Sequence, residues 1–439
     1  IRSLTGNNQP LLVIDGVPVS LGYLNRLNPN DVDDINILKG ASAASLYGPD
    51  GVNGVIIVKT KRGTKNGTPV VTVSNTTQFE KVLFLPKFQK QFGQGSSIDV
   101  NGIGVYDQIE NQQYGDEFDG SERELGRPND KGEQQKVPYS ALIGEKEKYF
   151  ATGVTSQNDV SISAKDFYLS AQDVNIAGTL AGDKNRRTTF SFKSAKEYGK
   201  FNADFTLTYT KSQYDVASNG AYWEVFNTAQ NVPLTQYKDW RNYTWASPNH
   251  YFNDYYTNPY FIKDRQRSRG TSHDLIASTT LTYKILPWLN ATYRAGTTVS
   301  NSYYKNTTEA FTYSPYAHTS GKYNTTTDLY ASVGDGQSVS SRITSEAFLS
   351  GQKDFGKFNV DGLIGQSYRE TFAKSVGVSG GNLIIPTLYN LSNRTGEPGA
   401  SESFSETKLM GVFGKFSVGY DNWAFLEVTG RNDWDSRLP

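Results

Sequence analysis

The feature that most constrains the fold is a repeated alternation of apolar and polar residues that begins at Val70. In 201–210, for example, Phe, Ala, Leu and Tyr side chains fall on one face of a predicted strand, and Asn, Asp and Thr side chains fall on the other. A period of two is typical of a β-strand with one apolar face. The sequence therefore predicts a mainly β chain with eleven strands, at about 70–79, 156–164, 167–179, 187–196, 201–211, 272–284, 288–300, 342–352, 357–370, 406–420 and 423–431.

Short and long connections alternate between these strands. Turns such as Glu197–Lys200 are short, whereas the connections at about 81–157, 213–271, 302–341 and 372–405 are long. Outer-membrane β-barrels have short periplasmic turns and long extracellular loops, and a soluble β-sandwich has little reason to separate its connections in this way. The pattern indicates a large antiparallel transmembrane β-barrel. The mean hydropathy of −0.55 argues against membrane-spanning helices but does not count against barrel strands.

Aromatic residues near the ends of predicted strands support a barrel in the bacterial outer membrane. Tyr209, Tyr283, Trp288, Tyr420 and Trp423 occupy positions expected of the aromatic girdles at the two membrane interfaces. The balance of 44 Lys and Arg against 44 Asp and Glu argues against nucleic-acid binding. Because the sequence contains no Cys, disulfides and thiolate metal sites are excluded.

The first sixty residues predict a small α+β unit. Leu11–Ile14 and Val17–Val19 flank the pair Asp15–Gly16, which favours a β-hairpin. Asn30 or Asp31 is expected to cap a brief helix. The unit is completed by a strand at 35–38, a helix at 41–47 closed by Gly48, and a strand at 55–60.

Three blocks of this unit, 11–18, 32–48 and 51–61, closely resemble the plug domain of SusC/RagA-type TonB-dependent outer-membrane transporters. The resemblance implies a barrel of about 22 strands that is filled by a plug. It divides the chain into the C-terminal part of a plug domain at 1–66 and the first half of a barrel with long extracellular loops at 67–439. Since eleven strands cannot close such a barrel, we expect a fragment with sequence missing at both ends. The residues that carry the plug signature are Asp15, Gly16, Lys39, Gly40, Tyr47, Gly48, Asn53 and Gly54.

The resemblance also implies a function. Transporters of this family import nutrients with energy supplied by TonB, which would act through a segment missing from this chain. A SusD-like surface lipoprotein caps the barrel as a lid, and the implied ligands are oligosaccharides or oligopeptides. Lipid and lipopolysaccharide of the outer membrane would surround the wall. The family needs no cofactor.

Literal matches to catalytic and metal-binding motifs do not form functional sites. The residues at 377–381 fit the G-x-S-x-G pattern, but no His follows His318, so a hydrolase triad cannot be completed in that order. His250, His273 and His318 are too far apart in sequence to suggest metal ligands. The sequence therefore predicts no enzyme, with no catalytic, cofactor-binding or metal-binding residues.

The segment 222–261 is rich in aromatic residues, with 13 in 40 positions against 13% in the whole chain. Aromatic faces suit contact with sugars or with peptide side chains, which favours a platform for the ligand. Alternatively, the rings form the small core that a long loop needs to stay ordered. The candidate substrate-binding residues are Tyr222, Trp223, Tyr237, Trp240, Tyr243 and Trp245.

Polar residues on the inner face of the predicted wall are expected to find partners on the plug. Asp204, Arg294, Asp361 and Arg369 are examples. Buried charges need hydrogen bonds and ion pairs, and a polar interface can release the plug without exposing much apolar surface.

The one basic run of the chain, 263–269, precedes a predicted strand. Two interpretations are open for it: contact with lipopolysaccharide phosphates, or a solvated loop at the outer rim.

Two other functions fit parts of the pattern. A passive outer-membrane porin or scaffold would use the same barrel with a merely structural plug. A secreted β-sandwich that binds glycans would have aromatic strands but would fold in water without detergent.

Overall fold

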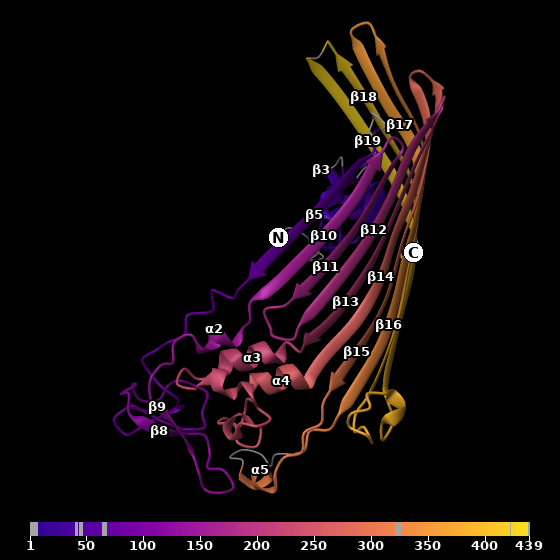
Figure 1. The fold of residues 1–439 in the computed structure, drawn as a ribbon. Helices are drawn as coiled ribbons and strands as arrows, with labels where there is room; N and C mark the ends of the chain where they lie inside the picture. Colours follow the sequence, from indigo (N-terminus) through magenta and orange to yellow (C-terminus); the bar gives the residue numbers. More distant parts are fainter. Residues whose placement is uncertain are drawn as a thin grey trace.

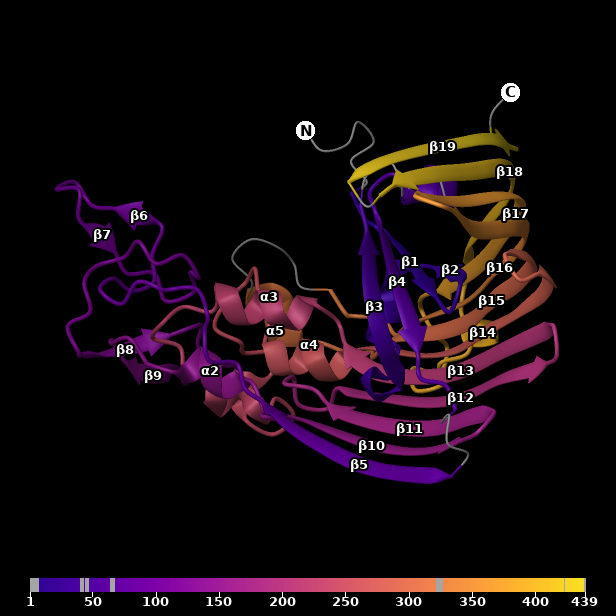
Figure 2. The same ribbon diagram turned by 90° about the horizontal axis from the view of Figure 1, so that it is seen from above.

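The protein is organised around one large curved β-sheet, as a computed structural model shows. The sheet has eleven antiparallel strands, and strands that follow one another in sequence are neighbours in it. Figure 2 shows that the strands form an arc with a second, smaller sheet on its concave side. We call the eleven-stranded sheet the wall. The structure describes residues 8–39, 43, 47–63, 68–320, 327–421 and 423–437.

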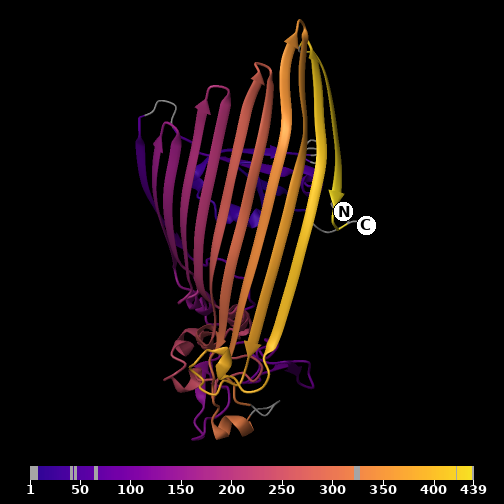
Figure 3. The same ribbon diagram turned by 90° about the vertical axis from the view of Figure 1, so that its right-hand side faces the viewer.

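All eleven predicted strands are confirmed, and so is the mainly β fold. The short turns lie at one end of the wall and the long connections lie at the other (Figures 1 and 3). The strands are β5 (Val70–Glu80), β10 (Gly153–Ala164), β11 (Phe167–Ala177), β12 (Lys184–Tyr198), β13 (Phe201–Ala217), β14 (Gln266–Leu286), β15 (Leu289–Thr308), β16 (Ser332–Phe355), β17 (Phe358–Gly380), β18 (Gly399–Tyr420) and β19 (Ala424–Asp435).

Several strands extend beyond their predicted ends on the side of the long connections. β16 starts ten residues before the predicted position, and β17 ends ten residues after it. The added part of β16, Ser332–Ser341, consists mostly of Gly, Ser, Asp and Gln. An apolar face is required only where a strand crosses the hydrocarbon layer, so the alternation stops there while backbone pairing continues.

The two faces of the wall differ in polarity. Phe205, Ile343 and Ile364 are 42%, 51% and 62% exposed on the convex face. The neighbouring positions Asp204 and Glu346 lie on the concave face, because successive side chains of a strand alternate between faces. An apolar convex face is what contact with lipid requires, and it points to the outer membrane. Among the described residues, no helix is both long enough and apolar enough to cross a bilayer.

Four of the five aromatic residues assigned to girdles lie near strand ends or in turns. Tyr283 and Tyr420 are close to the ends of β14 and β18, and Trp288 and Trp423 lie in short turns. Tyr209 instead lies inside β13, because that strand extends further than predicted; its hydroxyl is 2.7 Å from Nδ1 of His273.

A four-stranded sheet with the order β2-β1-β4-β3 lies on the concave side of the wall (Figure 2). β1 (Leu11–Ile14) pairs antiparallel with β2 (Val17–Val19) and parallel with β4 (Val55–Thr60). β3 (Val32–Leu38) completes the sheet beside β4. We call the described residues between 8 and 63 the plug segment. The predicted hairpin and strands of this unit are therefore confirmed.

The helical turns of the plug segment differ from the prediction. The short helix η2 (Pro29–Asp31) is capped by Asn28, whose side chain accepts a hydrogen bond from Asn30 N at 2.9 Å. The prediction that Asn30 or Asp31 forms the cap is wrong, because Pro29 already fits the first helical position, where its missing N–H is not needed. The helix predicted at 41–47 falls largely outside the described residues. The other turns are η1 (Leu21–Asn25) and η3 (Gly48–Gly51).

The described residues of the connections 81–152, 218–265 and 309–331 gather at the end of the wall opposite the short turns (Figure 1). We call them the loop assembly. It has its own apolar core, in which Tyr237 and Phe261 are almost completely buried. Its elements are β6 (Ser97–Ile98), β7 (Gly104–Val105), β8 (Glu122–Leu125), β9 (Gln135–Pro138), α2 (Glu145–Tyr149), α3 (Gly220–Asn227), η4 (Leu234–Lys238), η5 (Thr244–Ala246), α4 (Pro259–Arg265) and α5 (Pro315–Ser320); η6 (Leu391–Asn393) lies between β17 and β18.

Candidate functional site

The hairpin turn of the plug segment packs directly on the wall. Asp15 and Gly16 have φ values of 47° and 85°, the left-handed conformations that an Asp-Gly turn favours. A Cβ atom on Gly16 would lie 2.8 Å from Cδ of Arg294 in β15, so a larger residue does not fit. The Asp15 carboxylate accepts a hydrogen bond from Thr60 N at 3.0 Å. The turn is thus held by the plug sheet on one side and by the wall on the other.

Two of the four wall residues predicted to pair with the plug do so. Arg62 forms an ion pair with Asp204 of β13, and Asp50 forms one with Arg369 of β17. These contacts connect the plug segment to strands on different parts of the arc. The predicted wall residues that form no ion pair with the described plug residues are Arg294, which pairs with Glu346 of β16 at 3.0 Å, and Asp361.

An ion pair joins Arg26 of the plug segment to the buried Asp274 of β14. Their charged atoms are 2.6 Å apart, and the Asp274 side chain is 1% exposed. Asp274 also accepts hydrogen bonds from Ser300 Oγ at 2.6 Å and from Ser272 Oγ at 3.1 Å. A carboxylate this buried is tolerated only when it is paired and hydrogen-bonded. Asp274 therefore depends on the plug segment staying in place.

A second buried carboxylate, Asp31 of the plug segment, is held by β11. It accepts hydrogen bonds from the hydroxyl groups of Tyr168 and Ser170, both at 2.7 Å. By contrast, the main apolar cluster between plug and wall includes one buried wall residue, Ile276. The interface is therefore largely polar, and water can replace its contacts at a lower cost than it can cover an apolar surface.

The remaining signature residues shape the plug segment. Gly48 has a φ of 67° and lies against Arg431 of β19, where a Cβ would be 3.0 Å from Nε. Gly54 accepts a hydrogen bond from Leu11 N at 3.0 Å. Tyr47 packs against a small apolar cluster, Asn53 donates to Gln9 O at 3.4 Å, Lys39 is exposed, and Gly40 lies outside the described residues.

The candidate aromatic residues of the loop assembly fall into three groups, which are buried, exposed and half-buried. Tyr237 is fully buried and donates to Gln135 Oε1 at 2.7 Å. Trp240 is 7% exposed, and its Nε1 donates to Asp264 Oδ2 at 3.0 Å. Trp223, in contrast, is 64% exposed on α3. The half-buried members, which pack against the loop core, are Tyr222, Tyr243 and Trp245.

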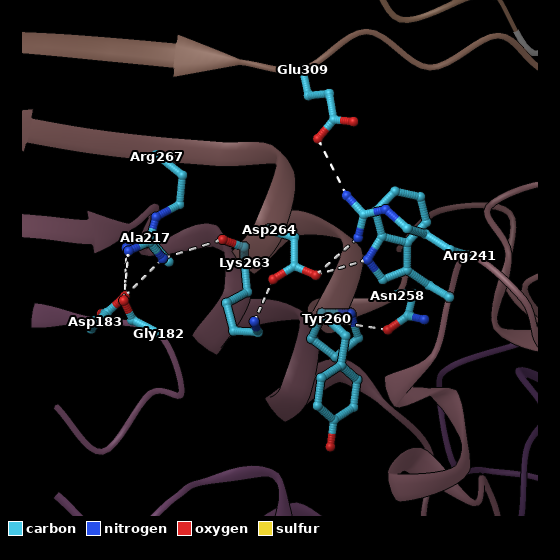
Figure 4. Close-up of polar contacts among 12 residues, drawn as sticks. Gly182, Asp183, Ala217, Arg241, Asn258, Tyr260, Lys263, Asp264, Arg267 and Glu309 are labelled. Atoms are coloured by element: carbon cyan, nitrogen blue, oxygen red, sulfur yellow. Dashed lines mark hydrogen bonds and ion pairs between the residues drawn. The ribbon is translucent and has the colours of Figure 1, made fainter. Parts of the chain in front are cut away.

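Asp264 organises the polar contacts around Trp240 (Figure 4). Its carboxylate also forms ion pairs with Lys263 and Arg241. The Arg241 guanidinium lies 3.9 Å from the centroid of the Trp240 ring. Burial alone would raise the pKa of Asp264, but hydrogen bonds from Lys263 and Trp240 hold it below its ordinary value. The network fixes Trp240 as part of the structure of the loop.

The basic run at 263–269 is not a solvated loop. Its first half belongs to α4 and its second half to β14. Arg267 is 12% exposed and donates to Asp183 Oδ1 at 3.0 Å and to Asp215 Oδ1 at 2.9 Å (Figure 4 shows the contact with Asp183). Because the guanidinium of Arg267 is already paired with Asp183 and Asp215, it is not available to lipopolysaccharide phosphates. Arg269 is 51% exposed but is also paired with Asp215, at 2.8 Å.

Sequence reasoning missed two features. The alternation in β14 places Asp274 on the inner face, which marks it as a wall residue with a partner, but nothing local identifies Arg26. A polar pocket in the loop assembly includes Glu224 and His250. These residues lie in or beside the aromatic segment without forming any recognisable motif, so no sequence signal groups them.

Comparison with known proteins agrees with this architecture. A family model described as the TonB-dependent receptor plug domain matches residues 1–55. The TonB-dependent receptor SusC of Bacteroides thetaiotaomicron is 26% identical over 321 residues, which cover 64% of this chain and 28% of SusC. TonB-dependent receptor P26 of Formosa agariphila is 45% identical over 93 residues, or 20% of this chain and 9% of the relative. TonB-dependent receptor P3 of the same organism is 25% identical and covers 99% of this chain and 40% of the relative.

Solved structures show the same fold. The RagAB peptide importer in its open-open state superposes with a TM-score of 0.69 at 18% identity, covering 98% of this chain and 48% of that chain. The RagAB peptide transporter gives a TM-score of 0.68, with 99% of this chain and 50% of that chain covered. The chain thus spans half or less of the length of these relatives.

In sequence and fold the chain is similar to SusC/RagA-type TonB-dependent transporters, and residues 1–55 match the TonB-dependent receptor plug domain.

Proposed function

We propose that the protein imports a nutrient across the bacterial outer membrane in a TonB-dependent manner and performs no enzymatic step. The cargo is an oligosaccharide or an oligopeptide, and a SusD-like surface lipoprotein serves as the lid. Residues 1–66 belong to the plug, and residues 67–439 belong to the barrel wall and its extracellular loops. The surrounding lipid and lipopolysaccharide contact the convex face.

The observation that carries this proposal is the polar contact between plug and wall. Wall residues bind four charged residues of the plug segment: Arg26, Asp31, Asp50 and Arg62. The plug is therefore held by polar contacts without a large apolar interface. Such contacts suit a gate that opens under force and closes again, because water satisfies the separated charges. The description of RagAB as a peptide importer and of SusC as a TonB-dependent receptor supports the same interpretation.

The proposal is tested by uptake measurements in cells with and without TonB. The cargo is first identified by mass spectrometry of ligand that co-purifies with the native protein. Import of that cargo should fall to background in cells without TonB, because the proposed transport takes its energy from TonB. Import that continues without TonB would favour the passive porin instead.

Two tryptophan variants separate the ligand platform from the loop core. Trp223→Ala should weaken binding of the identified cargo by about 1 kcal/mol while leaving the thermal stability unchanged, because the ring is exposed. Trp240→Ala should lower stability by about 3 kcal/mol or more, because the buried ring anchors the loop core. Calorimetric titration and thermal unfolding measure the two effects. Unchanged affinity in the Trp223 variant would remove this residue from the platform.

A further inference from the structure

A small polar pocket lies in the loop assembly, away from the contacts between plug and wall. Its volume is about 260 Å³, and three long connections contribute to its lining through Arg127, Glu224, His250 and Tyr316. Binding sites for whole ligands usually measure 300 to 1,000 Å³. This pocket is therefore suited to one compact group of a larger ligand.

Glu224 supplies the pocket with a carboxyl group that has no cationic partner. Its Oε2 accepts a hydrogen bond from Thr257 N at 2.9 Å, and it forms no ion pair with the described residues. Burial raises the pKa of Glu224 to about 7, although the Thr257 N–H partly opposes the shift. An unpaired carboxyl at a half-buried position gains strongly from an incoming cation.

The other polar groups of the pocket reinforce this preference. Arg127 is neutralised by Asp254, with Nη2 and Oδ2 2.5 Å apart. His250 has a buried Nδ1 without a hydrogen-bond partner, and burial lowers its pKa, so the ring is neutral at pH 7. A nearby acid, Asp130, adds further negative charge. The pocket thus combines excess negative charge with a neutral imidazole.

Tyrosine rings complete the lining. Tyr251, Tyr256, Tyr313 and Tyr316 surround the pocket, and Tyr255 at its edge is 54% exposed, so the pocket opens to solvent there. The faces of aromatic rings attract cations, and the attraction is stronger when the cation is partly desolvated. An anionic group would be repelled by the carboxylates and by the ring faces, and the one arginine of the lining is already paired with Asp254.

We propose that this pocket binds a primary ammonium group of the cargo, with Glu224 as its counter-ion. The amine belongs to a peptide or to an amino sugar, which share this chemistry. The proposal rests on the proposed import function only in treating the bound molecule as cargo.

Binding of matched small probes to the full-length protein tests the proposal. The peptide probes are alanyl-alanine amide and its N-acetyl form, and the sugar probes are glucosamine and N-acetylglucosamine. At pH 7 the free amine of at least one pair should bind about tenfold more tightly than its acetylated form. The pair that shows this preference identifies the source of the amine. Equal binding within both pairs, or no binding of any probe, would overturn the proposal.

Glu224→Gln is the decisive variant because glutamine keeps the acceptor for Thr257 N and removes only the charge. The variant should bind the amine and its acetylated form equally, whereas Glu122→Gln, at an exposed position in β8, should behave like the unchanged protein. A preference that survives in Glu224→Gln would place the amine elsewhere and refute the site. Because these assays measure binding without transport, they are independent of the TonB experiment.

The pH dependence provides a second readout. Below pH 7 the probe amines stay charged while Glu224 becomes protonated, so affinity should fall by about tenfold between pH 7 and 5.5. The other titratable groups around the pocket are Arg127, Asp130, His250, Asp254 and the tyrosines, and burial lowers the pKa of His250. Most of the fall should therefore disappear in Glu224→Gln. An unchanged pH profile in that variant would contradict the role of Glu224.

Discussion

A disulfide between residues 17 and 296 is expected to stop import reversibly. Val17 begins β2 of the plug segment, and a Cβ atom on Gly296 of β15 would lie 2.7 Å from Cγ2 of Val17. The two β-carbons are thus near the separation of about 3.8 Å found in disulfides, and Val17→Cys makes room for Gly296→Cys. The 439 residues contain no Cys that would compete. Oxidation of the double variant should reduce import to background, because a plug fixed to the wall cannot clear a path.

The same double variant in its reduced state is the first control, since it carries the same substitutions and should import normally. The second control is a disulfide inside the wall, between Thr189→Cys and Thr210→Cys. The hydroxyl oxygens of these residues are 3.3 Å apart in neighbouring strands, so this link leaves the plug free. Cross-linking is quantified by thiol labelling. Undiminished import by fully cross-linked 17–296 protein would show that this part of the plug stays on the wall during transport.

The wall could be predicted from the sequence because lipid imposes a regular pattern on its strands. Phe205 and its neighbours alternate with polar residues, and this is sufficient to locate β13. The pattern fails near the long connections. In Ser332–Ser341 both faces of β16 carry small or polar residues, and only the backbone pairing with β15 and β17 shows that the strand continues.

The candidate site was harder to predict because apolar and polar residues do not repeat at a regular spacing in irregular loops. Trp223 and Trp240 look equivalent in the sequence, yet one is 64% exposed and the other is 7% exposed. The difference arises from Asp264 and Phe261, which follow more than twenty residues after Trp240 and meet it only in the folded loop. The polar pocket around Glu224 is assembled in the same way from three separate connections.

Local sequence patterns also do not predict which residues of the plug and the wall contact each other. The sequence indicated that Asp204 and Arg369 would meet the plug, since charges on the inner face need partners, and both do. It suggested the same for Arg294, which pairs instead with Glu346 on the adjacent strand. Inner-face position thus predicts that a partner exists, whereas its identity depends on where the plug docks.

The second large effect is expected from Arg26→Met, which should loosen the plug by about 3 kcal/mol. The substitution leaves the Asp274 carboxylate, which is 1% exposed, without its counter-ion, and an unpaired buried charge is costly. Arg62→Met is the matched control, because the Arg62–Asp204 pair has side-chain exposures of 59% and 30%. Pairs of this kind contribute about 0 to 1 kcal/mol.

Release of the plug can be followed as the urea concentration at which the protein begins to conduct ions in a planar bilayer. This concentration should fall markedly for Arg26→Met and only slightly for Arg62→Met. Adding Asp274→Asn to Arg26→Met should restore part of the loss, because the unpaired charge is then removed as well. Equal midpoints for the two Met variants would mean that burial does not set the strength of the plug contacts. In that case the force needed to open the gate would be spread evenly over the polar interface.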